Sequence, residues 1–92
     1  MAKAELKVPG GKLLRASSVV RGGRIVEVRI TGDFFMHPEE AIDELERWLR
    51  GVESSEVAVR GAVEAFFAFV APMVLGAAPQ DFAEVVLRSF SA

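Results

Sequence analysis

Few residues in this 92-residue chain could carry out chemistry by themselves. His37 is the only histidine and there is no cysteine. A catalytic site built on His37 would therefore have neither a thiol nucleophile nor a second imidazole. Gly10-Gly11-Lys12 places a lysine after two glycines, but a phosphate-binding loop needs an earlier glycine and a Ser or Thr where Leu13 stands. The adjacent carboxylates Glu39 and Glu40 are explained by a helix start, where the helix dipole stabilises negative charge. The chain is therefore predicted not to be an enzyme on its own.

The charges are divided unevenly along the chain. Residues 1–32 hold seven basic and two acidic residues, whereas residues 33–92 hold four basic and eleven acidic ones. A basic N-terminal hairpin could attract a phosphate-bearing ligand or an acidic protein surface, or it could be a solvated face whose charges prevent strand aggregation. Nucleic-acid binding is one function that a basic hairpin suggests. However, no aromatic residue is interleaved with the basic ones between Lys3 and Arg29 to stack on bases.

The composition indicates one domain, residues 1–92, that shares part of its surface with another chain. Hydrophobic residues make up 51% before the 8 glycines are added. Typical soluble domains reach ~45–50% with glycine included, so a partner is expected to cover some apolar surface. No segment resembles a signal peptide, and the longest apolar stretch, residues 65–79, is interrupted by Pro72 and shorter than the ~20 residues of a membrane span. A cytoplasmic protein without membrane contact is expected.

The first third of the sequence has the pattern of antiparallel strands. Residues 12–20 form a candidate strand, and Gly22-Gly23 supplies the positive φ angles that a two-residue hairpin turn needs. Residues 25–30 alternate apolar and polar side chains as a half-buried strand does, and a short extended segment precedes residue 9. The inward positions predicted for residues 25–30 are Val26, Val28 and Ile30, and the preceding short segment begins with Leu6 and Val8. Together these segments predict a meander.

Three helices follow, as judged by hydrophobic spacing and capping residues. The first is predicted over residues 38–49, with proline at its first position, a glycine after its end, and His37 as its cap or simply exposed. Ser54 or Ser55 can cap a second helix that is apolar nearly all round, and a third starts at Pro79. Strands followed by helices predict an α+β fold, a small antiparallel sheet of two or three strands packed against about three helices. The apolar stripes of the three helices are Ala41, Ile42, Leu45, Trp48 and Leu49; Val59, Ala62, Val63, Phe66, Phe67 and Val70; and Phe82, Ala83, Val86 and Phe90.

Residues 31–40, between the last strand and the first helix, form an acidic corner with two adjacent aromatic residues. Neighbouring side chains of an extended chain point to opposite sides, so burying both Phe34 and Phe35 requires a bend. Either both rings plug the core, or at least one contacts a partner, as aromatic residues do in interface cores. Asp33 is expected to cap or brace the turn through the backbone. Lys12 is expected to be a solvated strand residue.

The order of several short motifs resembles one known family, the C-terminal accessory domain of lipoate-protein ligase, which some archaea make as a separate small subunit. The resemblance spans roughly residues 5–90, and its most specific part is the glycine-aspartate-diphenylalanine corner. The motifs that carry it are Gly10-Gly11-Lys12-Leu13-Leu14-Arg15, Gly22-Gly23, Gly32-Asp33-Phe34-Phe35, a Glu-rich helix ending in Gly51-Val52, and Gly76-Ala77-Ala78-Pro79-Gln80-Asp81-Phe82.

The resemblance implies a non-catalytic accessory subunit in a heterodimer. A larger catalytic subunit would bind ATP, lipoate and Mg, form lipoyl-adenylate with the help of this chain, and pass the lipoyl group to a lysine of an acceptor protein. This chain would bind no cofactor alone and would contact the acceptor only indirectly. We place its interface with the catalytic subunit at Lys12, Arg15, Asp33, Phe34 and Phe35.

Two other functions stay open from the residues: a stand-alone module that binds protein or nucleic acid, and a small-molecule pocket between the Phe-rich helices. Because the sequence begins with its own methionine, a separate subunit is expected, although a fragment of a fused ligase would look the same.

Overall fold

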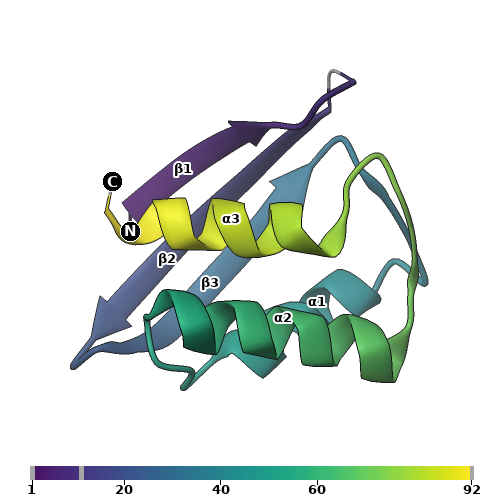
Figure 1. The fold of residues 1–92 in the computed structure, drawn as a ribbon. Coiled ribbons are helices and arrows are strands. Elements are labelled where there is room, and N and C mark those ends of the chain that lie inside the picture. Colours follow the sequence, from purple (N-terminus) through teal and green to yellow (C-terminus); the bar gives the residue numbers. More distant parts are fainter. Residues whose placement is uncertain (1, 11, 92) are drawn as a thin grey trace.

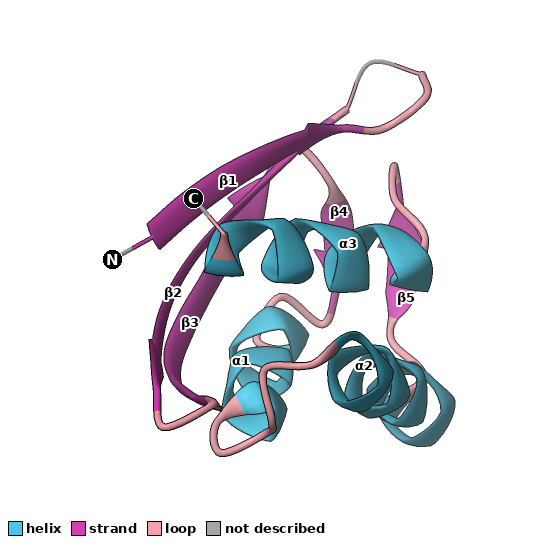
Figure 2. Ribbon diagram, turned by 60° about the vertical axis from the view of Figure 1, so that its left-hand side comes forward, coloured by secondary structure: helices cyan, strands magenta, loops and turns pink. Residues whose placement is uncertain are grey.

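The computed structural model describes residues 2–10 and 12–91 and has the α+β architecture expected from the sequence. A three-stranded antiparallel sheet, in the order β1-β2-β3, is covered on one face by helices, and β4 and β5 form a separate two-stranded sheet (Figures 1 and 2). The elements in chain order are β1 (Ala2–Lys7), β2 (Leu13–Arg21), β3 (Arg24–Gly32), β4 (Phe35–His37), α1 (Ala41–Leu49), α2 (Glu56–Val70), β5 (Met73–Leu75) and α3 (Pro79–Phe90).

The predicted meander is confirmed, with one error in register. Gly22 and Gly23 have φ angles of 59° and 75°, so they form the tight β2–β3 turn that only glycine adopts without strain. Along β3 the pairing with β2 skips Val26, which is the extra residue of a β-bulge. The prediction that Val26 faces the core is wrong, because the bulge leaves it 44% exposed and buries Ile25 in its place.

The outer edge of β3 is covered by groups from other parts of the chain. The Ile25 N–H donates to the Val52 carbonyl at 2.9 Å, and the Gly51 N–H donates to the Ile25 carbonyl at 2.8 Å. Further along the strand, the Ile30 N–H donates to Glu46 Oε2 of α1 at 2.8 Å. These bonds satisfy backbone groups that an edge strand would otherwise leave open.

Helix α1 begins at Ala41, later than the predicted residue 38, because the chain remains extended as β4 through His37 and then needs a turn. The Ala41 N–H donates to the Pro38 carbonyl at 3.0 Å to close that turn. The prediction of His37 as a helix cap is therefore wrong, and its alternative, simple exposure, is what the structure shows. At the other end Gly51 has a φ of 83°, which confirms the glycine stop.

Helices α2 and α3 begin where the sequence predicts. Ser55 rather than Ser54 caps α2, since its Oγ accepts a hydrogen bond from the Ala58 N–H at 3.2 Å. At the start of α3, the Asp81 carboxylate accepts from the Ala78 N–H at 2.8 Å. The core between helices and sheet consists of aliphatic and aromatic side chains, the largest being Phe66, Phe82, Leu14, Ile25, Leu45 and Leu49. Within residues 2–10 and 12–91, none of the helices has the length and apolarity needed to cross a membrane.

Candidate functional site

The corner between β3 and β4 passes very close to the start of β2. A Cβ atom added to Gly32 would lie 2.3 Å from the Leu13 carbonyl oxygen and 3.1 Å from the Leu14 Cα. Directly after it, the Asp33 N–H donates to that same Leu13 carbonyl at 3.0 Å. Asp33 therefore braces the corner through its backbone, as expected, while its side chain stays exposed.

The two adjacent phenylalanines point in different directions. The Phe34 ring is half-buried and lies edge-on to Phe82 of α3, with 5.0 Å between ring centroids and an interplanar angle of 80°. The Phe35 side chain is 51% exposed. Of the two alternatives from the sequence, the structure excludes two core plugs and leaves one ring free for another molecule.

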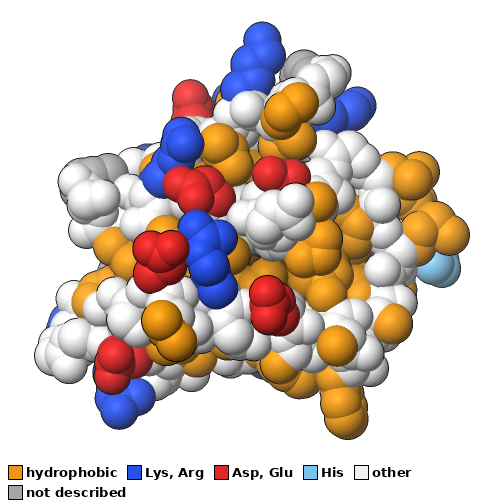
Figure 3. Space-filling model, in the orientation of Figure 1, with side chains coloured by type: hydrophobic (Ala, Val, Ile, Leu, Met, Phe, Trp, Pro, Cys, Tyr) orange, Lys and Arg blue, Asp and Glu red, His pale blue; other side chains and the backbone are white. Residues whose placement is uncertain are grey.

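Phe35 belongs to an apolar surface that the sequence did not reveal. In the β4–β5 ribbon, Phe35 pairs with Leu75 and His37 pairs with Met73, so all four side chains lie on one side. We name this surface, Phe35, His37, Met73 and Leu75, the ribbon face. Met73 and Leu75 are 57% and 61% exposed, and Figure 3 shows hydrophobic side chains gathered at the margin of the molecule beside the pale-blue histidine.

The other side of the ribbon holds it to the body of the protein. Met36 is only 4% exposed, and Val74 packs partly buried against the same core. The ribbon thus has a buried inner face that supports the fold and an outer face that the described residues leave open.

Lys12 borders the ribbon face. Its aliphatic carbons lie over the backbone of Gly76, where an added Cβ would be 3.2 Å from Lys12 Cγ and 3.4 Å from Lys12 Cε. Lys12 therefore lies beside Gly76, the residue that follows Leu75. Lys12 is exposed, as predicted, but it is not a strand residue, because β2 begins at Leu13. Gly11, part of the segment compared with a phosphate-binding loop, lies outside the described residues.

Arg15 is separated from the other predicted interface residues. Along β2 it alternates with the buried Leu14 and Ala16, so it faces the side of the sheet that the helices do not cover. Its Nε donates to Glu5 Oε2 on β1 at 2.8 Å. The structure thus brings Lys12 and residues 33–35 to one end of the molecule and places Arg15 on the open sheet face.

Two further exposed apolar side chains lie near opposite ends of α2. Phe69 is 83% exposed with its ring 6.1 Å from that of Trp48, and Val57 is 85% exposed. The near-continuous apolar character predicted for this helix is confirmed, and α2 offers an alternative docking surface.

The hollows in the surface are small. The one between α2 and α3 measures about 80 Å³ and is lined by residues such as Arg60 and Glu64 rather than by phenylalanines. Two shallower hollows measure about 290 and 220 Å³. Ligand pockets usually enclose ~300–1,000 Å³, and the hollow between α2 and α3 is far smaller, so it lends no support to a small-molecule site between the Phe-rich helices. Within the described residues, no group of three or more His, Asp or Glu side chains is arranged to hold a metal ion.

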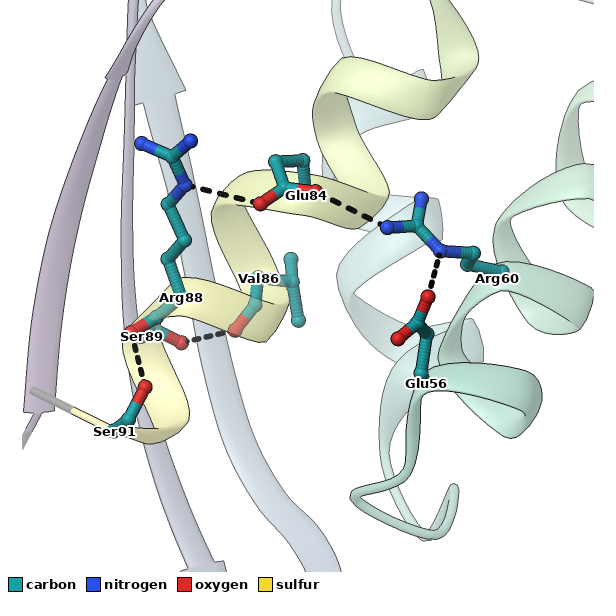
Figure 4. A network of polar contacts seen from close by, with 7 residues as sticks. All are labelled: Glu56, Arg60, Glu84, Val86, Arg88, Ser89 and Ser91. Carbon is teal, nitrogen blue, oxygen red and sulfur yellow. Dashed lines mark hydrogen bonds and ion pairs between the residues drawn. The ribbon is translucent and has the colours of Figure 1, made fainter.

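Polar side chains between α2 and α3 form an ion-pair network. Figure 4 shows the Glu84 carboxylate between two guanidinium groups, at 3.0 Å from Arg88 Nε and 3.1 Å from Arg60 Nη2. The bond from Arg88, and then that from Arg60, lowers the pKa of Glu84 below its ordinary value. Arg60 also pairs with Glu56 of its own helix at 3.2 Å. The Arg60–Glu84 pair joins α2 to α3.

Comparisons with known proteins identify the family of this chain. The family model described as bacterial lipoate protein ligase C-terminus matches residues 2–85. A curated protein of Thermoplasma acidophilum, "Lipoate-protein ligase A subunit 2", is 36% identical over 76 residues, which cover 80% of this chain and 76% of that protein.

A solved structure has the same fold over nearly the whole chain. It comes from an archaeal lipoylation system of Thermoplasma acidophilum, a bi-partite lipoate protein ligase and its E2 lipoyl domain. The match has a TM-score of 0.80 and 30% sequence identity, and it covers 91% of each chain. The resemblance drawn from the corner and hairpin motifs is confirmed, and the chain belongs to the family of the lipoate-protein ligase C-terminal domain.

Proposed function

We propose that this chain is the non-catalytic accessory subunit of a two-chain lipoate-protein ligase, needed for the ATP-dependent conversion of lipoate to lipoyl-adenylate. The observation that carries the proposal is the similarity to a ligase subunit 2 over 80% of this chain. The exposed apolar ribbon face is consistent with a protein that works in contact with another chain.

The proposed division of labour is the one that the resemblance to the lipoate-protein ligase family implies. Lipoate, ATP and Mg would be bound by the catalytic subunit, and this chain would contribute no nucleophile and no cofactor site. As a lid over the active site, it would hold ATP-binding loops in place and exclude water that hydrolyses the adenylate. Its movement away would then admit the lysine of the acceptor protein. We expect the heterodimer to work in the cytoplasm.

The rival function, a nucleic-acid-binding module, has weaker support. Two of the arginines on the open sheet face are near carboxylates, Arg15 at 2.8 Å from Glu5 and Arg29 at 3.8 Å from Glu27. Carboxylates interspersed with the basic residues reduce the attraction to a phosphate backbone.

An activation assay tests the proposal. The isolated chain is expected to form no lipoyl-adenylate from lipoate and ATP, and the catalytic subunit from the same genome to form it only when this chain is added. Adenylate formation is measured with each chain alone and with both together. Synthetic lipoyl-adenylate supplies the control, because the catalytic subunit alone should then transfer the lipoyl group to its acceptor. The proposal is wrong if the catalytic subunit alone forms the adenylate at the full rate.

A further inference from the structure

We infer that the ribbon face is the surface by which this chain docks into an apolar hollow of the catalytic subunit. The inference rests on the proposed function and adds the residues that make the contact. Two of them, Met73 and Leu75, lie in a strand that the sequence did not predict.

The exposed apolar side chains of the ribbon face do not contribute to the hydrophobic core of the fold. Phe34, Met36 and Val74 already anchor the corner and the ribbon from the inner side. Three large apolar side chains, each more than half exposed, therefore remain in contact with water at a hydrophobic cost that only another molecule could remove.

Charged residues lie at both ends of the ribbon face, with Lys12 and the exposed Asp33 at one end and two glutamates at the other. Lys12 lies beside Gly76, next to the Phe35–Leu75 pair. At the other end, Glu39 and Glu40 follow His37 after one proline and are exposed. A complementary surface would present an apolar hollow with an acidic group on the Lys12 side and a basic group on the glutamate side.

Shape and area favour a different chain over a second copy of this one. Beside the pale-blue histidine, hydrophobic side chains project from the margin of the molecule (Figure 3), and two such projections would meet only at their tips. Stable interfaces bury about 800 Å² per partner, more than three half-exposed side chains supply. A larger chain with a hollow can enclose these side chains and gain further contacts around them, so the ribbon face would serve as the central anchor.

The first experiment compares two exposed phenylalanines. Phe35→Ser is expected to weaken binding to the catalytic subunit about 30-fold or more, as the loss of an interface anchor does. Phe69→Ser makes the same chemical change at an 83% exposed position on α2 and is expected to leave the affinity within about twofold. Isothermal titration calorimetry gives the affinities, and circular dichroism melts show that each variant is folded. Leu75→Ser serves as the second ribbon variant should Phe35→Ser lose its structure.

A second pair of variants tests the charge at the ribbon's end. Lys12→Glu is expected to weaken binding at low salt, with the difference from wild type shrinking as salt is added. Lys3→Glu, the same reversal at an exposed position near the opposite end of β1, should have no such effect.

Each outcome separates this inference from the proposed function. Wild-type affinity in both Phe35→Ser and Leu75→Ser, or a loss confined to Phe69→Ser, would overturn the ribbon face as the docking surface and leave the accessory role intact. If the wild-type chain does not bind the catalytic subunit, both ideas are wrong. Light scattering measures whether this chain binds a second copy of itself. If the wild-type chain is a dimer and Phe35→Ser makes it a monomer, the ribbon face binds another copy of this chain and the inference is refuted.

Discussion

At the scale of single residues, Gly32 is required by the close approach of two backbone segments. Gly32→Ala would press a methyl group against the Leu13 carbonyl oxygen, 2.3 Å from the Cβ position, and backbone cannot give way as a side chain can. We expect a loss of about 1–3 kcal/mol in unfolding free energy, as for other overpacked sites. Urea denaturation followed by circular dichroism measures it.

Gly61 provides the matched control for this prediction. It lies within α2 with nothing within 4 Å of an added Cβ, so Gly61→Ala should raise the unfolding free energy by about 0.5–1 kcal/mol through helix propensity. Equal stabilities of the two variants would show that the corner adjusts freely and that the glycine there is not required.

The residue scale also shows how far sequence reasoning reaches into the candidate site. Opposite directions for Phe34 and Phe35 follow from the alternation of an extended chain, and the sequence left one free ring as an alternative. Which ring faces outward depends on Phe82 of α3, nearly fifty residues later in the chain. The location of Lys12 likewise depends on Gly76, a neighbour that no local pattern connects to it.

At the scale of elements, a buried pair of hydroxyl groups joins β2 to α3. Ser18 Oγ and Ser89 Oγ are 2.7 Å apart, and Ser89 Oγ donates to the Val86 carbonyl at 2.6 Å. Because the single Ser89 proton is used for Val86, Ser18 must donate within the pair. Both residues are at most 2% exposed, so neither hydroxyl has water to replace a lost partner.

A double-mutant cycle tests this contact. Ser89→Ala leaves the Ser18 hydroxyl buried without an acceptor in the pair and should cost about 1–3 kcal/mol in unfolding free energy. Ser18→Ala together with Ser89→Ala should cost less than the two single changes added, since two apolar groups of similar shape replace two polar ones. Strict additivity in urea denaturation would contradict the coupling.

Long elements were predictable and short ones were not. The stripes of α1, α2 and α3 and the alternation of Val28 and Ile30 in β3 arise from local spacing, which the sequence itself displays. Strands β4 and β5 have three residues each and pair across 35 or more positions of the chain, so their signal is a tertiary contact. The bulge at Val26 has the same origin, because only the pairing with β2 reveals the extra residue.

At the scale of the whole molecule, the ion-pair network between α2 and α3 makes stability depend on pH. The pKa of Glu84 is below the ordinary carboxyl value of 4.5 in the folded protein, so the folded state binds this proton less tightly than the unfolded state does. The network therefore stabilises the folded protein when the pH is above the ordinary carboxyl pKa. This stabilisation is lost as the pH falls through the lowered pKa of Glu84 in the folded state. Glu84→Gln should therefore lower the melting temperature at pH 7 by about 1–3 °C, a small effect because the carboxylate is partly exposed.

The difference between the same variant and wild type should shrink as the pH falls below the ordinary carboxyl value of 4.5, because Glu84 then takes up a proton and loses the charge that the two arginines bind. Glu64→Gln on α2 is the control, since Glu64 has no ion pair within 4 Å among the described residues and should show no such convergence. A pH-independent difference between Glu84→Gln and wild type would mean that the change acts through packing.

The covered edge of β3 limits how this protein can polymerise. Fibres that grow by strand addition need an open backbone edge on both sides of every sheet they incorporate. Here the amide of Ile30 is already bound to a carboxylate, and backbone bonds from residues 51 and 52 occupy the edge near Ile25. A strand added beside β3 would have to displace these bonds, whereas β1 pairs on one side alone among the described strands. Addition beside β1, which joins two molecules edge to edge, is therefore favoured over growth from both edges into a filament while the fold is intact.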